Sequence, residues 1–197
     1  CAFCFTAAAE KLILSDIGNP FFGEVAQAVE RTAREEGYSL LLCNTNNDAQ
    51  QEEDCLSLLL TKQVDGIIWF SPINEELAET ATSKSKKAIV TITGKYEHLG
   101  THSVHIDDQI GAFTAVEHLI RLGHTRIGYI AEPEGPQLPR VRLNGYKLAL
   151  EKYGLKMDPE LIIHGTYKVE SGLKATKSFL EMENPPTAIF AANDIMA

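Results

Sequence analysis

Residues 186–197 read PTAIFAANDIMA, and this stretch decides the fold class of the chain. Residues 187–192 form a short apolar run of the kind that makes a strand buried on both faces of a sheet. Asn193 and Asp194 follow, and both residue types cap helix N-termini, so residues 195–197 are expected to open a helix. A doubly buried strand leading straight into a helix indicates a parallel sheet with helical crossovers.

The same alternation of strand and helix extends back along the whole chain. Helical connections of this length require parallel strands, and their right-handed crossover produces a doubly wound sheet. We therefore predict an α/β fold with two doubly wound parallel-sheet lobes, residues 11–123 and 124–197, the second lobe incomplete. The predicted strands are 11–15, 38–43, 66–70, 88–92, 104–106, 126–131, 161–164 and 188–192, and the predicted helices are 21–36, 49–62, 75–83, 108–122, 141–153 and 171–183.

Residues 1–10 match neither pattern, and we leave them unassigned, as a tail or an artefact. Their alternative interpretation is a truncated signal peptide, although no basic segment precedes the apolar residues. Cys1 and Cys4 have a CxxC spacing, but no strand precedes them as it does in redox proteins. Cys43 and Cys55 fit buried, reduced thiols, which favour a cytoplasmic location.

The composition argues against two classes of partner. The formal net charge is −9 and the pI is about 5.1, so bulk charge does not favour DNA or an anionic membrane. No apolar run approaches the roughly 20 residues that span a bilayer. We expect no membrane partner, and contact with DNA only through a segment outside this chain.

Ligands of open parallel sheets bind beyond the carboxyl ends of the strands, which selects few residues. Ser15 and Asp16 follow the first strand, and Phe21 and Phe22 open the next helix. Neighbouring helical residues diverge by about 100°, so one phenyl ring can face a ligand unless both pack between helices. Aromatic residues also end the third strand. Phe70 is expected to form part of a pocket wall, and Trp69 either lines the pocket or belongs to the core.

The second lobe offers a polar set of candidates. Arg142 lies in the first turn of a helix, at the unfavourable end of the helix dipole. A guanidinium that grips a carboxylate or vicinal hydroxyls would explain that position, the alternative being a surface arginine, which fits Arg140 better. Tyr167 could cover a ligand, and Asn193 could bind a ligand hydroxyl, while Asp194 caps the helix.

Catalytic and metal motifs are absent from the sequence. It contains no GxGxxG or GxxxxGK[ST] phosphate loop, no HExxH and no GxSxG. His118 and His124 flank a helix end and suit structural hydrogen bonds, and Asp107, Asp108 and the acidic run 52–54 suit helix caps and solvated helix starts. We therefore predict no catalytic residues, no metal and no cofactor.

Six motifs occur together in a specific order: DIGNPFF (16–22), GYSLLLCNTNND (37–48), VDGII (64–68), HLIRLGHTRIGYI (118–130), RLNGYKLAL (142–150) and PTAIFAANDIMA (186–197). On these motifs the chain from about Leu12 to Ala197 resembles the effector-binding core of the LacI/GalR family of bacterial transcription regulators. The resemblance implies a periplasmic-binding-protein type I-like fold whose two lobes close on a small molecule, most often a sugar. It also implies a homodimer in which closure alters operator affinity.

The resemblance also implies ligand contacts, position by position. Where the family usually has an Asp-Arg pair, this chain has Thr93-Gly94-Lys95, so no contact is assigned there. The family's helix-turn-helix and its elements beyond Ala197 are missing, and we expect residues 1–197 alone to be poorly soluble or to bind effector weakly. Competing interpretations are a periplasmic solute-binding protein and an enzyme on a doubly wound sheet. The implied contacts are Phe21, Phe22, Phe70, Tyr167, Arg142 and Asn193, with Asp16 and Ser15 nearby.

Overall fold

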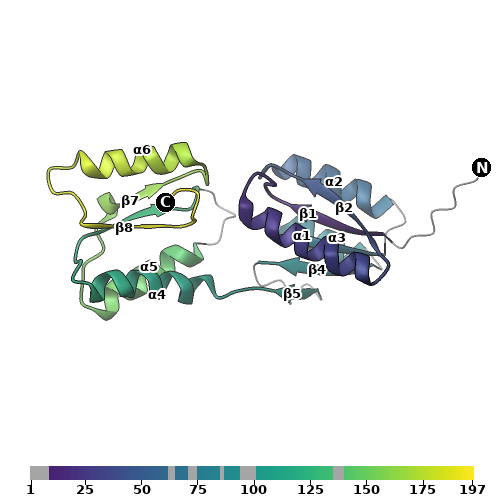
Figure 1. Ribbon diagram of the computed structural model, residues 1–197, viewed down its shortest axis with the longest axis horizontal. Helices are drawn as coiled ribbons and strands as arrows, with labels where there is room; N and C mark the ends of the chain where they lie inside the picture. Colours follow the sequence, from purple (N-terminus) through teal and green to yellow (C-terminus); the bar gives the residue numbers. More distant parts are fainter. Residues whose placement is uncertain (1–8, 62–64, 71–74, 85–86, 94–100, 135–139) are drawn as a thin grey trace, which may run out of the picture. The chain divides into compact units, whose positions relative to one another are not determined.

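The computed structural model describes residues 9–61, 65–70, 75–84, 87–93, 101–134 and 140–197. The chain forms two compact units, Cys1–Ile106 and Asp107–Ala197, called unit 1 and unit 2 below (Figure 1). The interpretations placed on Cys1 and Cys4, and on Gly94 and Lys95, lie outside the described residues.

Unit 1 is built on a parallel sheet. Within the described residues it has five strands, in the order β2-β1-β3-β4-β5. Register pairs such as Ile13 with Cys43 and Ile13 with Trp69 place β1 between β2 and β3. The strands are β1 (Ala9–Leu14), β2 (Ser39–Asn44), β3 (Gly66–Phe70), β4 (Ala88–Ile92) and β5 (His102–Val104).

Helices cover both faces of this sheet, as Figure 1 shows. Successive strand residues point to opposite faces, so Leu12 and Leu14 pack with Ala26 of α1 (Pro20–Glu35). Ile13 instead packs with Leu56 of α2 (Ala49–Thr61) and Ala78 of α3 (Glu75–Lys84). The prediction of a doubly wound sheet with apolar strands is confirmed.

The ends of α1 follow from local chemistry. Asn19 caps the helix by accepting a 3.1 Å hydrogen bond from the Phe21 N–H, and Pro20 occupies the first helical position, where its missing N–H costs nothing. Gly37 then leaves the helix with φ of +81°, a conformation that favours glycine. Both ends agree with the sequence-based prediction to within one residue.

Unit 2 holds a smaller parallel sheet, with strand order β7-β6-β8 among the described residues. Tyr129 of β6 stacks with Tyr146 and with Phe190, and the ring centroids are 5.1 Å apart in each pair. Gly128 leaves room on the opposite face for the ring of Phe179, whose atoms would lie 3.0–3.2 Å from an added Cβ. The elements are β6 (Ile127–Ala131), β7 (Ile162–His164), β8 (Ala188–Ala191), α4 (Asp108–Arg121), α5 (Val141–Lys152), α6 (Val169–Leu180) and a 3-10 turn, η2 (Pro159–Leu161).

Helix α4 packs closely against α5, and this contact sets the boundary between the units. At Gly145 an added Cβ would lie 2.8 Å from the Cβ of Ala112 and 2.9 Å from the backbone nitrogen of Phe113. The backbones approach so closely that α4 belongs to unit 2. The structural boundary therefore falls at Ile106 and Asp107, ahead of α4, rather than at residues 123–124 behind it.

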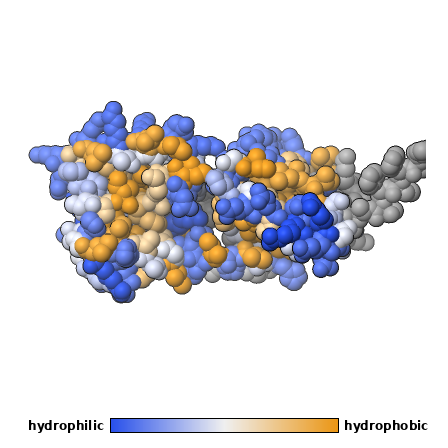
Figure 2. Space-filling view, in the orientation of Figure 1, coloured by the Kyte–Doolittle hydropathy of each residue, from blue (hydrophilic) through white to orange (hydrophobic). Residues whose placement is uncertain are grey.

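Helix α6 has two apolar faces. Ala175 and Phe179 are buried against the sheet, whereas Val169, Leu173 and Leu180 are 53%, 67% and 69% exposed. Figure 2 shows this apolar surface in orange along the edge of unit 2 where Figure 1 places α6.

Among the described helices, none has the length and apolar character needed to cross a membrane.

Candidate ligand-binding site

In unit 1 the loop after β1 is fixed by hydrogen bonds. Ser15 is buried, and its carbonyl oxygen accepts the N–H of Asn47 at 2.9 Å. Asp16 accepts the N–H two residues further on at 3.0 Å, and the side chain of Asn44 accepts the N–H of Ile17 at 2.9 Å. The carboxyl ends of β1 and β2 are thereby joined, and Asp16 is half-buried at the edge selected from the sequence.

Three phenyl rings meet beside this loop. Phe21 and Phe22 lie edge to face with centroids 5.4 Å apart, and each also contacts Phe70 edge to face, at 6.3 and 5.2 Å. Phe22 and Phe70 belong to the core under α1, with Phe70 only 1% exposed. Phe21 is 47% exposed, so the predicted divergence of the two neighbouring rings is confirmed. Phe70 is buried behind the other two rings and is not exposed as the wall of a pocket, so that prediction is wrong for Phe70.

Trp69 belongs to the core, and its hydrogen bond to Glu52 corrects the prediction made for the acidic run 52–54. Its side chain is fully buried and donates from Nε1 to Oε1 of Glu52 at 2.8 Å. Glu52 is itself only 1% exposed. The acidic run 52–54 is therefore not entirely a solvated helix start, because its first carboxylate turns inward to bind the indole.

In unit 2 Arg142 forms an ion pair that the sequence did not reveal. Its Nε and Nη2 atoms donate to Oδ1 of Asp108 at 3.1 and 2.9 Å, and the two side chains are only 31% and 24% exposed. Burial opposes the charge of Arg142, but Asp108 and the neighbouring Tyr167 outweigh that effect and raise its pKa. Asp107 is the N-cap of α4, accepting the N–H of Ile110, so the cap prediction holds for Asp107 and is wrong for Asp108.

Tyr167 contacts the same arginine from the loop after β7. Its backbone has φ of +59°, which is uncommon for a non-glycine residue and is maintained only where the surroundings enforce it. Burial raises the pKa of its phenol, while the hydrogen bond to Arg142 acts in the opposite direction. Arg142 and Tyr167, selected separately from the sequence, therefore lie together.

A second carboxylate lies at the end of β6, the strand beside β7. Glu132 is 7% exposed and accepts a hydrogen bond of 2.5 Å from the hydroxyl of Tyr129. Burial and this carboxylate raise the pKa of Tyr129. His164 contacts the backbone carbonyl of Glu132 through Nδ1 at 2.6 Å, and its Nε2 lies 3.6 Å from Glu134.

Asn193 lies two residues beyond the end of β8 and caps the turn that follows, the role predicted for Asp194. Its Oδ1 accepts the N–H of Met196 at 3.1 Å, so Asn193 caps the final turn, and the prediction that Asp194 does so is wrong. This hydrogen bond uses the amide oxygen of Asn193 and fixes the orientation of its side chain. The site prediction for Asn193 as a ligand contact stays a prediction.

The candidate residues form two clusters, each described within its own unit. Unit 1 brings together Phe21, Phe22 and Phe70, with Ser15 and Asp16 in the adjoining loop. Unit 2 brings together the residues around Arg142. No group of three metal-ligand side chains was found among the described residues. The unit 2 cluster consists of Asp108, Tyr129, Glu132, Arg142 and Tyr167.

A family model for periplasmic binding proteins and the sugar-binding domain of the LacI family matches residues 10–197. The chain belongs to this family. Members with regulatory names are similar over nearly all of it: the HTH-type transcriptional repressor CytR of Escherichia coli K12 is 37% identical over 186 residues, covering 94% of this chain. The match covers 54% of CytR, so the chain spans little more than half the length of that relative.

Solved structures of LacI-family proteins share the fold. The transcription regulator CcpA of Lactococcus lactis superposes with a TM-score of 0.83 at 26% identity, covering 96% of this chain and 69% of CcpA. A LacI-family regulator of Enterococcus faecium with bound ribose gives 0.81 at 25% identity, covering 95% of this chain and 68% of that one. The α/β fold with parallel sheets is that of LacI-family effector-binding domains.

Proposed function

We propose that this chain is the effector-sensing part of a LacI-family transcriptional regulator, in which a small polar metabolite binds at the carboxyl ends of parallel strands. The observation that carries the proposal is the Arg142–Asp108 pair with Tyr167, a buried polar cluster located where ligands of parallel sheets bind. Family membership and the regulatory names of the relatives support it.

The charges of the unit 2 cluster favour a neutral ligand. Asp108 already neutralises Arg142, and the buried Glu132 adds a further negative charge. A phosphate or carboxylate would meet two carboxylates and only one, paired, guanidinium. Ligand hydroxyls can instead accept from the remaining N–H groups of Arg142 and donate to Asp108. This argument selects hydroxyl groups over a carboxylate, the two partners that the sequence left open.

The aromatic cluster of unit 1 supplies the apolar part of recognition. Phe21 exposes nearly half of its surface and is supported edge to face by Phe22 and Phe70. A ring backed in this way offers a flat face to the C–H side of a sugar or to a planar base. Sugars and nucleosides combine such a face with hydroxyls, so they are the ligand classes we propose.

In the whole regulator we propose that ligand binding changes the lobe orientation across a homodimer and thereby changes operator affinity in the cytoplasm. DNA would be bound through a helix-turn-helix outside this chain. Coupling energies of this kind are about 1–3 kcal/mol and reciprocal, so operator DNA must change effector affinity by the same factor. A periplasmic solute-binding protein is the second candidate, and the regulatory names of the relatives favour the first.

The proposal is tested by calorimetric titration of neutral sugars and nucleosides, with their phosphate esters as the charged comparison. Arg142→Ala should weaken binding of any neutral ligand at least tenfold, since a buried charged donor is lost. Arg140→Ala is the matched control, because this neighbouring arginine is exposed and should change affinity less than twofold. Equal affinity of Arg142→Ala and the parent would overturn the site. The coding sequence upstream of Cys1 separates the two candidates, through a helix-turn-helix or a hydrophobic leader.

A further inference from the structure

Two thiols of unit 1 lie in contact on neighbouring elements. Cys43 is the penultimate residue of β2, Cys55 lies in the middle of α2, and a short loop joins the two elements. Both cysteines are free and half-buried, and their side chains share a hydrogen bond. The pair therefore consists of two reduced sulfur atoms within direct reach of each other.

The packing around the pair explains why the two residues meet. Leu56, the neighbour of Cys55, is 2% exposed and packs into the cluster that holds Ile13 and Trp69. Cys43 pairs with Ile13 across the β1–β2 register and packs against the same cluster. The core of unit 1 thus fixes α2 over β2, and the two thiols are held together by apolar packing around them.

The two thiols are not equivalent. Burial and the neighbouring Cys43 raise the pKa of Cys55 to about 11, with smaller contributions from Asp54 and Glu52. A hydrogen bond that raises the pKa of an acid favours its protonated form. Burial and the shared hydrogen bond therefore disfavour the thiolate form of Cys55. Because the thiolate is the nucleophile, we assign the first reaction with an electrophile to Cys43, the other sulfur of the pair.

We propose that Cys43 and Cys55 form a reversible dithiol–disulfide modification site that reacts with hydroperoxides. In the first step the Cys43 thiol gives up its proton and its sulfur attacks one oxygen of hydrogen peroxide; the O–O bond breaks, and hydroxide leaves with the electron pair and takes up that proton as water, giving a sulfenic acid. Cys55 then attacks the Cys43 sulfur, loses its proton and expels the second oxygen as water. In total two thiols and one peroxide give one disulfide and two water molecules. A dithiol reductant reverses the modification.

The position of the pair connects it to the candidate ligand site of the same unit. Cys43 directly precedes Asn44, whose side chain holds the N–H of Ile17 at 2.9 Å. The loop that carries Ser15 and Asp16 is therefore hydrogen-bonded to the residue that follows Cys43 in the sequence. A disulfide that ties α2 to β2 acts on the strand end that positions this loop.

The test uses the chain with Cys1→Ser and Cys4→Ser, which removes the other two thiols of the sequence. The protein is treated with hydrogen peroxide, denatured, labelled with a maleimide, and its intact mass is measured before and after reduction with dithiothreitol. We expect loss of both maleimide-reactive thiols, an intramolecular Cys43–Cys55 link in the peptide map, and full recovery on reduction. Persistence of both free thiols, or a cross-link between chains only, would overturn the proposal.

Single variants test the order of the two steps. In the same background Cys55→Ser should accumulate a dimedone-reactive sulfenic acid at Cys43, because the resolving thiol is gone. Cys43→Ser should leave Cys55 as a thiol at the same peroxide dose. The emission of Trp69, the only tryptophan in the sequence, verifies that each variant keeps the core of unit 1. Sulfenic acid at Cys55 in preference to Cys43 would contradict the proposed order.

Discussion

Arg142 donates two hydrogen bonds to one oxygen of Asp108, from Nε at 3.1 Å and from Nη2 at 2.9 Å. The pair connects the first turn of α5 to the first residue of α4, two helices that also approach closely at Gly145. An arginine at a helix N-terminus is unfavourable toward the helix dipole, and the Asp108 carboxylate compensates that effect locally. The pair orients the guanidinium before any ligand arrives, which lowers the entropy lost on binding.

Asp108→Asn should therefore change the preference of the unit 2 cluster between neutral and negatively charged ligands. The substitution keeps the shape of the side chain but frees the charge of Arg142, so affinity for a neutral effector should fall about tenfold, the usual effect of losing a charged hydrogen bond. Affinity for the corresponding phosphate ester should rise relative to the neutral compound. Titration calorimetry with both compounds measures the ratio, and Asp107→Asn, which changes only the neighbouring cap, serves as the control. An unchanged ratio would show that Asp108 does not set ligand charge.

The fold could be predicted from the sequence because each element carries its own signal. The apolar run at β3 was bounded correctly, since a strand buried on both faces reads as a continuous hydrophobic segment. Asn19 and Gly37 marked the ends of α1 for reasons that are local to the backbone. The unit boundary could not be found in this way, because the membership of α4 depends on its packing at Gly145 and not on its own sequence.

Part of the candidate site could also be predicted from local features of the sequence. Residues that follow strands were selected by a rule about strand ends, which brought Arg142 and Tyr167 to one place. Asp108 was missed because a carboxylate at a helix start is also the ordinary sign of a cap. The partnership of Glu52 and Trp69 was missed as well, since a tertiary hydrogen bond across 17 residues leaves no mark in a local pattern. Glu132 lies just beyond the end of β6, where the same rule could have selected it.

Gly145→Ala should destabilise unit 2 strongly. A methyl group there would overlap the backbone of α4 near Phe113 and the side chain of Ala112, so the two helices must separate. We expect a loss of about 1–3 kcal/mol in the free energy of unfolding, as for other overpacked sites. Gly111→Ala is the matched control in α4, because an added Cβ meets nothing within 4 Å, and it should stabilise by about 0.5–1 kcal/mol. Urea denaturation measures both, and equal effects would contradict the close approach at Gly145.

Tyr146→Phe should remove a buried hydrogen bond without changing the packing. The hydroxyl of Tyr146, which is 1% exposed, donates to the carbonyl of Ile127 at 2.9 Å. Its loss leaves a buried carbonyl with one partner fewer, which costs about 1–2 kcal/mol of unfolding free energy. The control is Tyr38→Phe, because this half-buried tyrosine forms no side-chain hydrogen bond with the described residues, and its loss of a hydroxyl should matter by less than about 0.5 kcal/mol. A shift of the denaturation midpoint at constant slope is the expected signature, and identical midpoints for the two variants would be incompatible with this role.

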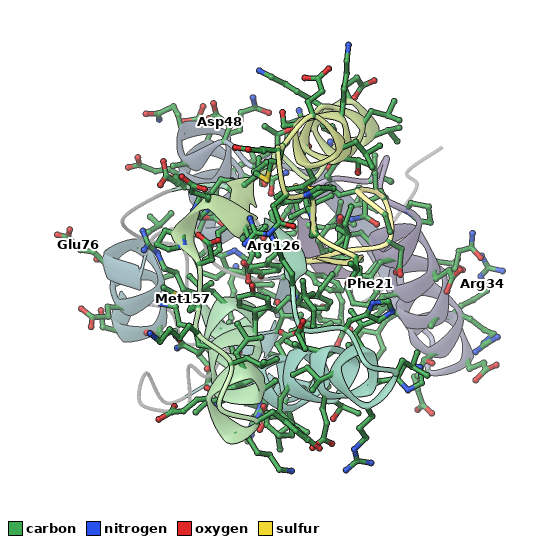
Figure 3. All side chains as sticks on the ribbon, turned by 90° about the vertical axis from the view of Figure 1, so that its left-hand side faces the viewer. Phe21, Arg34, Asp48, Glu76, Arg126 and Met157 are labelled. Atoms are coloured by element: carbon green, nitrogen blue, oxygen red, sulfur yellow. The ribbon has the colours of Figure 1, made fainter. Side chains whose placement is uncertain are left out.

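Asp158→Asn should make the stability of unit 2 less dependent on pH. Asp158 accepts a 2.7 Å hydrogen bond from Arg126, a labelled residue in Figure 3, and this bond, with one from the backbone N–H of Glu160, lowers the pKa of its carboxyl. A carboxyl whose pKa is lower in the folded than in the unfolded protein contributes stability above the unfolded pKa and loses it as the pH falls through the folded value. The variant should therefore melt at a lower temperature than the parent at neutral pH. The difference should disappear in strong acid, below the pKa of the folded state. Thermal melts across the acid range measure it, and a difference that stays constant with pH would show that the ion pair does not supply the stability.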